Sequence, residues 1–294
     1  MIGPEVEGPA GSGSGGLARM PTLANHEVGG LSVGGFETWI DLPRLKLCFD
    51  IGRCPTEAVK RPTVLFTHAH MDHMGGVAWH AATRALLGMP PPTYVLPRVN
   101  AADFERLIEA WRRLDRSQLP HRLVPCEPGD EVELPNRMLA RPFHAPHVAP
   151  CQGYGLWSRK TVLAPEYEGL PQAEIQRLRV DEGVEVTRAV ETPEVAFTGD
   201  TTIEVVEREE VVRTARLLIM EVTFLDDRVT VESSRSRGHV HLDEVVERAD
   251  LFENEAILLT HVSRRYKPDE VRAILDARLP AGLRERVTPL LEGF

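Results

Sequence analysis

The sequence contains few cysteines and no long apolar run. Only four cysteines occur in 294 residues (Cys48, Cys54, Cys126 and Cys151), and no two of them form a Cys-x-x-Cys pair. We therefore expect buried or incidental thiols rather than disulfides or thiolate metal ligands. No stretch approaches the roughly 20 apolar residues of a membrane span. The first residues also lack a basic stretch followed by an apolar one, so a secretory signal is not predicted. We expect a cytoplasmic protein without a membrane partner.

An excess of positive charge is also absent. The formal net charge is −10, with 42% hydrophobic and 27% charged residues. These fractions are ordinary for a globular protein and allow a substantial core. The negative charge argues only weakly against a polyanionic partner, because a local basic surface acts within about one Debye length.

The first 18 residues differ in composition from the rest of the chain. Residues 1–18 are rich in glycine, serine and proline, which predicts a disordered tail. Short apolar runs then alternate with amphipathic ones and no domain-sized linker intervenes, so residues 19–294 are predicted to form one α/β domain. Residues 159–193 are highly charged and are predicted to be a short insertion. This insertion is either a surface loop or an arm that holds substrate and carries a short helix.

Local patterns predict the individual elements. Strands are predicted at residues 45–49, 63–66, 93–96, 131–134, 139–143, 153–157, 194–197, 217–219 and 256–259. Helices are predicted at residues 76–87, 101–114, 172–178, 202–209, 242–252 and 268–278.

Three imidazoles and a carboxylate stand within six positions. They belong to His68, His70, Asp72 and His73. Titratable groups crowded this closely repel one another or change protonation unless a cation lies between them, so the cluster indicates a metal-dependent hydrolase. Gly75-Gly76 is expected to open a helix, which places the cluster in a loop at the carboxyl end of a strand. Residues two apart in an extended segment point the same way, so His68 and His70 are expected to share one metal. Asp72 and His73, beyond a turn, are expected to reach a second one.

Later strand ends supply the ligands that one loop cannot. Asp200 follows an apolar strand and can bridge two cations, and Gly199 before it is expected to let the backbone approach a bound group closely. His261 ends the strand at residues 256–260. His144 and His147 both follow the strand at residues 139–143, and the residues alone leave open which of them completes the first site.

Taken together, these residues make the chain similar to a known family. It resembles the metallo-β-lactamase superfamily and, within it, the tRNase Z (ribonuclease Z) family of tRNA 3′-endonucleases, in particular the short plant-type form. The Thr-His-x-His-x-Asp-His stretch identifies only the superfamily, which also holds glyoxalases, lactonases and β-lactamases. Glu-x-Thr-Phe at residues 221–224 and His-x-Ser-x-Arg-Tyr at residues 261–266 narrow the likeness. Further matching stretches lie at residues 30–35, 49–55, 151–154 and 193–202.

The resemblance implies a fold and a ligand set. The fold would be an αβ/βα four-layer sandwich, in which two mixed sheets are flanked by helices. Two Zn²⁺ ions per chain are implied, and Mn²⁺ or Fe²⁺ would also suit ligands without thiolate. The implied ligands are His68, His70 and His147 for one ion and Asp72, His73 and His261 for the other, with Asp200 as the bridge. His147 is preferred to His144 because the family has a ligand histidine a few residues before a Gly-Tyr pair.

The family also has a glutamate paired with a later histidine. Here Glu221 is the glutamate, and chemistry alone leaves His239 and His241 as equal partners. The Gly-His stretch of the family favours His239. The resemblance implies attack of a metal-held hydroxide on a phosphodiester, with Asp72 orienting it and accepting its proton. His239, positioned by Glu221, would stabilise the phosphorane or protonate the leaving 3′-oxygen.

The implied partner is precursor tRNA, cut to leave a tRNA 3′-hydroxyl, and the implied assembly is a homodimer. A nuclease needs cations near its metal site, and the candidates are Arg235, Arg237, Arg264, Arg265 and Lys267. The chain departs from the family at Met71, where glycine is common, and its insertion is short and not basic, unlike the tRNA-gripping arm of many relatives.

The alternative function is a hydrolase of a small phosphodiester, thioester or lactone on the same fold. A thioesterase or lactonase would not need the Glu221–His239 pair. A protein that binds metal without turnover is the third alternative.

Overall fold

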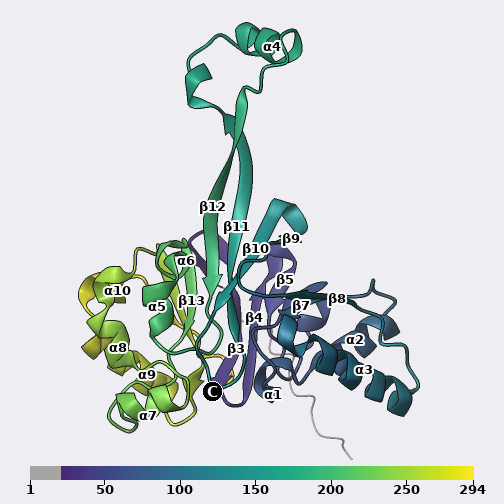
Figure 1. The fold of residues 1–294 in the computed structure, drawn as a ribbon. Coiled ribbons are helices and arrows are strands. Elements are labelled where there is room, and N and C mark those ends of the chain that lie inside the picture. The colour runs from purple at the N-terminus through teal and green to yellow at the C-terminus, as the bar shows by residue number, and fades with distance from the viewer. Residues whose placement is uncertain (1–20) are drawn as a thin grey trace, which may run out of the picture.

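Two seven-stranded mixed sheets face each other in the computed structural model, which describes residues 21–294 (Figure 1). The tail predicted at residues 1–18 lies outside the described residues. In spatial order, the first sheet consists of β15 (Val262–Ser263), β3 (Gly29–Gly34), β4 (Glu37–Leu42), β5 (Leu47–Phe49), β6 (Thr63–Leu65), β7 (Thr93–Pro97) and β8 (Arg122–Cys126). The second consists of β16 (Val287–Pro289), β14 (Ala256–Thr260), β13 (Leu217–Glu221), β12 (Thr187–Phe197), β11 (Gln152–Leu163), β10 (Met138–His144) and β9 (Val132–Leu134). A small separate ribbon pairs β1 (Thr22–Leu23) with β2 (His26–Glu27).

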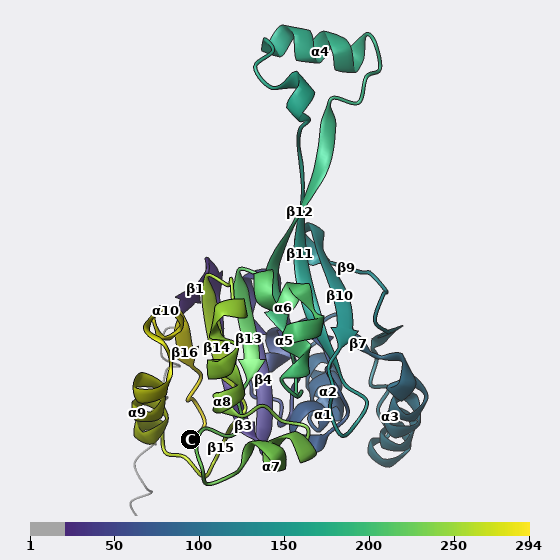
Figure 2. The same ribbon diagram turned by 60° about the vertical axis from the view of Figure 1, so that its left-hand side comes forward.

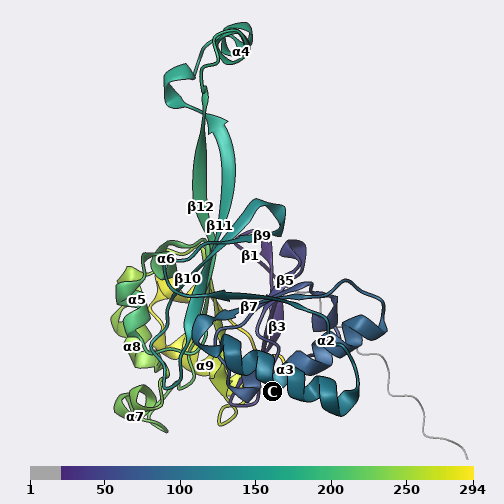
Figure 3. The ribbon, with the colours of Figure 1, turned by 45° about the vertical axis from the view of Figure 1, so that its right-hand side comes forward.

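Helices cover the outer face of each sheet. The α-helices are α1 (Met71–Met74), α2 (Val77–Leu86), α3 (Ala101–Asp115), α4 (Gln172–Val180), α5 (Glu204–Arg208), α6 (Glu210–Thr214), α7 (Val231–Ser236), α8 (Leu242–Glu247), α9 (Pro268–Arg278) and α10 (Ala281–Arg284). Short 3₁₀ turns are η1 (Pro43–Leu45), η2 (Ala58–Lys60), η3 (Arg98–Asn100), η4 (Pro135–Arg137), η5 (Pro165–Tyr167) and η6 (Ala249–Leu251). Helices α2 and α3 pack on the first sheet, whereas α5, α6, α8, α9 and α10 pack on the second (Figure 3).

Alternation along the strands explains the layers. In β13, Leu217 and Ile219 point into the core between the sheets, whereas Leu218 and Met220 point into the core under the helices. Successive side chains of a strand face opposite sides of its sheet, so an unbroken apolar strand needs cover on both faces. The result is the predicted four-layer sandwich, and the fold class is confirmed.

Several predicted boundaries are wrong in detail. Asp72 and His73, expected beyond a turn in a loop before Gly75-Gly76, lie in the one-turn helix α1. The helix predicted over residues 202–209 is shorter, and that over 242–252 breaks into α8 and the turn η6. The β3–β4 hairpin and α7 were not predicted from the sequence. The sequence pattern shows neither element, because both are short and partly polar.

Residues 159–193 are not a simple loop between strands. Strands β11 and β12 continue as an antiparallel ribbon as far as the Leu163–Thr187 pair, and the turn η5 and helix α4 lie at the tip. Figure 2 shows the ribbon projecting well beyond the body of the protein. Helix α4 buries none of its residues, so the tip makes little contact with the rest of the fold.

The cysteines behave as predicted, since all four are buried and free. Among residues 21–294, no helix has both the length and the apolar content that crossing a membrane requires.

Candidate metal centre

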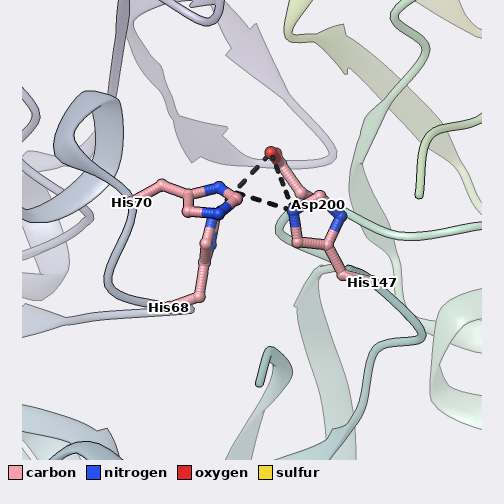
Figure 4. Close-up of side chains that lie close together, drawn as sticks. All are labelled: His68, His70, His147 and Asp200. Atoms are coloured by element: carbon pink, nitrogen blue, oxygen red, sulfur yellow. Dashed lines mark hydrogen bonds and ion pairs between the residues drawn. The ribbon is translucent and has the colours of Figure 1, made fainter. Parts of the chain in front are cut away.

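Strand ends deliver the candidate ligands to one edge of the sandwich. His68 follows β6, and His70 directly precedes α1, which carries Asp72 and His73. His147 lies in the β10–β11 loop, and Asp200 follows β12. His261 stands between β14 and β15 with a positive φ of 60°. Figure 4 shows that residues distant in sequence point at a common centre.

The ligand atoms fall into two groups. One atom each of His68, His70, His147 and Asp200 lie within 4.8 Å of one another, and the same holds for Asp72, His73 and His261. Asp200 lies between the two groups. One of its oxygens is 3.4 Å from His73 Nε2, and the other is 3.4 Å from His261 Nε2 and 3.8 Å from His68 Nε2. The structure thus brings together all seven side chains singled out in the sequence.

Unpartnered nitrogen atoms show that this donor set suits cations. The Nε2 atoms of His68, His73 and His261 are buried and have no hydrogen-bond partner. A buried polar atom left unpaired costs about 1–3 kcal/mol, so three that converge on the Asp200 carboxylate favour a cation between them. Imidazole nitrogen and carboxylate oxygen without thiolate are ligands typical of Zn²⁺, and also of Mn²⁺ or Fe²⁺.

Asp50 orients the ligands on the first-sheet side. Its fully buried carboxylate accepts hydrogen bonds from Thr67 N and Oγ1 (both 2.9 Å) and contacts His73 Nδ1 at 2.8 Å. Because Thr67 Oγ1 gives its proton to Asp50, it can only accept from His68 Nδ1, 3.0 Å away. Both imidazoles therefore carry their proton on Nδ1 and present the Nε2 lone pair to the centre.

Glu221 plays the same part on the second-sheet side. One of its oxygens accepts hydrogen bonds from Thr223 N (3.0 Å) and Thr223 Oγ1 (2.7 Å). The Thr223 hydroxyl must then accept from His261 Nδ1 at 3.0 Å, which leaves the His261 Nε2 lone pair free for a metal. The other oxygen contacts His239 Nδ1 at 2.9 Å and also accepts from the backbone N–H groups of Thr201 and Val240.

The pKa values follow from this arrangement. Burial alone would raise the pKa of the Asp200 carboxyl, but His261 and His73 hold it well below its usual range. Burial, together with the neighbouring His73, pushes the pKa of His68 well below 6.5. These shifts favour a charged carboxylate and a neutral imidazole, which are the forms that bind metal. His73 differs, because Asp200 and Asp50 raise its pKa against burial. The Asp200 and Asp50 carboxylates therefore favour a positive charge at His73.

The two alternatives left open by the sequence have clear positions. His144 is exposed, whereas His147 faces His70 at 3.5 Å and its Nδ1 donates to the carbonyl of Gly238 at 2.8 Å. His239, rather than His241, contacts Glu221. His241 instead accepts a hydrogen bond from Asp243 N at the start of α8.

His239 lies beside the metal cluster. Its ring centroid is 5.3 Å from that of His147 and 5.2 Å from that of His261. Burial opposes its protonation, but Glu221 and Asp200 outweigh burial and raise its pKa to about 9. The arrangement therefore places a proton donor at the edge of the candidate metal centre.

Two glycines allow the loops to close around the site. Gly199 has a φ of +60°, and a Cβ there would lie 2.7 Å from the side chain of Thr67. The expectation that Gly199 makes room for a bound group is therefore wrong, because its neighbour is the threonine that holds His68. Gly238 has a φ of +76°, and a Cβ there would lie 2.6 Å from His147 Nδ1.

Sequence reasoning missed the residues that orient the ligands. These residues are Asp50, Thr67 and Thr223. Asp50 and Thr223 are separated in sequence from the histidines that they orient, by up to 38 positions. A signal in the sequence existed only for Thr67, a short polar residue directly before His68. Only the folded chain shows that the hydroxyl groups link the carboxylates to the imidazoles.

Comparison with known proteins bears on this site. Residues 51–262 match the family described as a beta-lactamase superfamily domain. The chain is 44% identical over 274 residues to a tRNase Z of Arabidopsis thaliana, covering 92% of this chain and 97% of that protein. It is 38% identical over 275 residues to the chloroplastic tRNase Z of Arabidopsis thaliana, covering 92% of this chain and 77% of that one.

Solved structures agree on the fold. The short form of human tRNase Z has a TM-score of 0.58 at 18% identity, covering 91% of this chain and 97% of that one. A metallo-beta-lactamase fold protein from Bacillus subtilis has a TM-score of 0.60 at 16% identity, with the same coverages. These two likenesses concern the fold alone. The 44% identity to the first Arabidopsis protein over nearly its whole length shows the family as well. The chain belongs to the tRNase Z family of the beta-lactamase superfamily.

Proposed function

We propose that this protein is a metal-dependent endoribonuclease that removes the 3′ trailer from precursor tRNA and leaves a tRNA 3′-hydroxyl. The observation that carries the proposal is the Glu221–His239 pair beside the metal ligands. Relatives that carry the name tRNase Z over nearly the whole chain support it.

The resident cofactors proposed are two Zn²⁺ ions per chain. Their ligands would be His68, His70 and His147 for one ion and Asp72, His73 and His261 for the other, with Asp200 shared. If bound by these residues, two cations would supply a hydroxide at neutral pH and would offset the negative charge of a phosphodiester.

The protein's own groups provide the proton transfers. Asp72 is partly exposed, and His261 and His73 lower the pKa of its carboxyl against the effect of burial, so it stays charged and can orient the nucleophile by accepting a hydrogen bond. We assign to the same carboxylate the role of accepting the proton of the nucleophile. His239 gives its Nδ1 to Glu221, so its Nε2 faces the site and can protonate the leaving 3′-oxygen. Glu221 acts by positioning, because its oxygens are occupied by hydrogen-bond donors of the protein.

The alternative, a thioesterase or lactonase, leaves this pair without a role. An activated acyl group has a good leaving group, so its hydrolysis would not need the proton that His239 can give. A buried glutamate that holds a cationic histidine is useful where a poor alkoxide leaving group needs a proton.

A homodimer is proposed from the surface of α2 and α3. The exposed apolar side chains on these two helices are Trp79, Leu86, Leu107, Trp111 and Leu114, with exposed fractions between 44% and 85%. Both helices lie in the outer layer of the first sheet (Figure 3). Exposed apolar side chains that include two tryptophans are typical of an interface, where aromatic residues are enriched. We propose a second copy of the chain as the occupant, because a two-fold dimer pairs the same surface of both subunits.

The test is cleavage of a precursor tRNA with a 3′ trailer by zinc-loaded wild type, His239→Ala and Asp72→Ala. The wild type is expected to make one cut after the acceptor stem, and both variants are expected to lose at least 100-fold in rate, as is typical for a lost acid or base. His144→Ala is the matched control, because it removes an exposed histidine outside the cluster. An intact precursor, together with hydrolysis of a thioester by the same sample, would overturn the proposal.

A further inference from the structure

Two arginines beside the metal centre share one phenylalanine. The Cζ atom of Arg237 lies 5.7 Å from the ring centroid of Phe224, and that of Arg265 lies 5.9 Å from it. Phe224 is only 4% exposed, and its ring meets that of His239 edge-on at 6.2 Å. The ring thus connects two exposed guanidinium groups to the proposed proton donor.

Within residues 21–294, two nearby arginines, Arg228 and Arg235, are neutralised by carboxylates, whereas Arg237 and Arg265 are not, and Arg264 lies over Phe36 instead. Arg235 pairs with Glu244, and Arg228 pairs with Asp226 and Glu270. In the part of the chain that the structure describes, neither Arg237 nor Arg265 forms an ion pair with a carboxylate. The chain has 44 acidic residues against 34 basic ones, so guanidinium groups that stay unpaired beside the Phe224–His239 contact indicate an anionic partner.

We infer that Arg237 and Arg265, held by Phe224, bind RNA phosphates on the tRNA side of the scissile bond. The inference rests on the proposed function and deepens it. An aromatic face attracts a guanidinium within about 6 Å and limits its rotamers, so the cations are preorganised for phosphate without being neutralised. Arginine, with its planar fork, also contacts two phosphate oxygens at once.

The proposed role of His239 indicates which side of the scissile bond the two arginines contact. Its Nε2 serves the leaving 3′-oxygen, which belongs to the tRNA and not to the trailer. Arg237 stands two positions before His239 and shares the Phe224 ring with it. Arg265 follows the ligand His261 by four positions and reaches the same ring. Because both guanidinium groups share a ring with His239, we assign their phosphate contacts to the end of the substrate that becomes the mature tRNA.

The experiment measures kcat/KM for precursor tRNA with Arg237→Ala, Arg265→Ala and the control Arg272→Ala, over a range of salt concentrations. Arg272 is an exposed arginine that pairs with Asp269 on α9. Each test variant is expected to lose about tenfold in kcat/KM and to flatten the slope of log(kcat/KM) against log salt by about 0.7–0.9, the value for one lost phosphate contact. The lysine variants keep the charge and are expected to keep the slope while losing part of the affinity.

Two substrates, with trailers of one and of ten nucleotides, locate the contact. An equal loss on both substrates is the expected result, because the tRNA side is common to them. A loss seen only with the long trailer, or test variants that behave like Arg272→Ala, would overturn the inference while wild-type cleavage leaves the proposed function standing. If the wild type fails to cut either substrate, the proposed function fails, and the inference fails with it.

Discussion

Thr223→Val tests how the protein holds its ligands. The substitution keeps the shape of the side chain and removes only the hydroxyl that donates to Glu221 at 2.7 Å and contacts His261 Nδ1 at 3.0 Å. Thr223 is only 5% exposed, so water cannot replace that hydroxyl easily. His261 then loses the acceptor that keeps its proton on Nδ1, and a share of molecules would present Nε2–H to the metal instead.

The magnitude follows from the bonds lost. One hydrogen bond to a charged group and one orphaned imidazole N–H together amount to about 3 kcal/mol of unfolding free energy in the metal-free protein. Loss of the residue that orients a metal ligand lowers metal affinity by about 10- to 100-fold. The ion bound by His261 should therefore be lost first when free zinc is lowered.

The assay is zinc stoichiometry by native mass spectrometry against a graded chelator, with urea unfolding of the apoprotein. Thr223→Ser restores the hydroxyl and is expected to restore both the second ion and most of the stability. The reasoning is refuted if Thr223→Val keeps both ions at the wild-type chelator midpoint. It is also refuted if the valine and serine variants lose the ions alike.

Three further predictions follow from other parts of the structure. Burial, aided by Arg84, lowers the pKa of His80 from 6.5 to about 4, so its stabilisation is complete above pH 6.5 and is lost progressively down to pH 4. In urea unfolding, wild type should therefore lose about 3 kcal/mol more than His80→Gln between these two pH values, and equal losses would contradict this. Leu114→Asp places a charge on the apolar α2–α3 face, where Leu114 is 77% exposed. It should shift the protein from dimer to monomer in sedimentation without changing the unfolding temperature of the monomer, and an unchanged sedimentation coefficient would exclude this face. Replacing residues 165–185 by Asn-Gly closes the ribbon at the Ala164–Val186 contact. The unfolding temperature should hold because α4 buries nothing, and the salt dependence of tRNA cleavage should hold because the removed segment has six acidic residues against two arginines. A flatter salt slope would show that its arginines contact phosphate.

Much of the fold could be predicted from local patterns. The helix at Pro268–Arg278 matches its prediction at both ends, because proline and two acidic residues mark its start. The strands around residues 63–66 and 217–219 were recognisable as continuous apolar runs, since strands covered on both faces are apolar throughout. The β3–β4 hairpin was missed because its residues include glycine, serine and threonine, which give no clear alternation.

The arm shows a different limit. Charged residues at 159–163 suggested an insertion, but they continue β11 and pair with β12. Neither face of this ribbon is buried, so its strands need no alternation of apolar and polar residues. The sequence pattern therefore does not show that these residues form strands.

By itself the sequence determined the chemistry available to this protein. The spacing His-x-His-x-Asp-His, followed by an aspartate and a histidine at later strand ends, specified imidazole and carboxylate donors without thiolate. It left His144 and His147 open, as well as His239 and His241, because neighbours in sequence have the same chemistry. Tertiary structure decided between them, since only one of each pair points at the centre. It also decided which hydroxyl joins Glu221 to His261, because hydrogen-bond direction depends on where atoms lie in space.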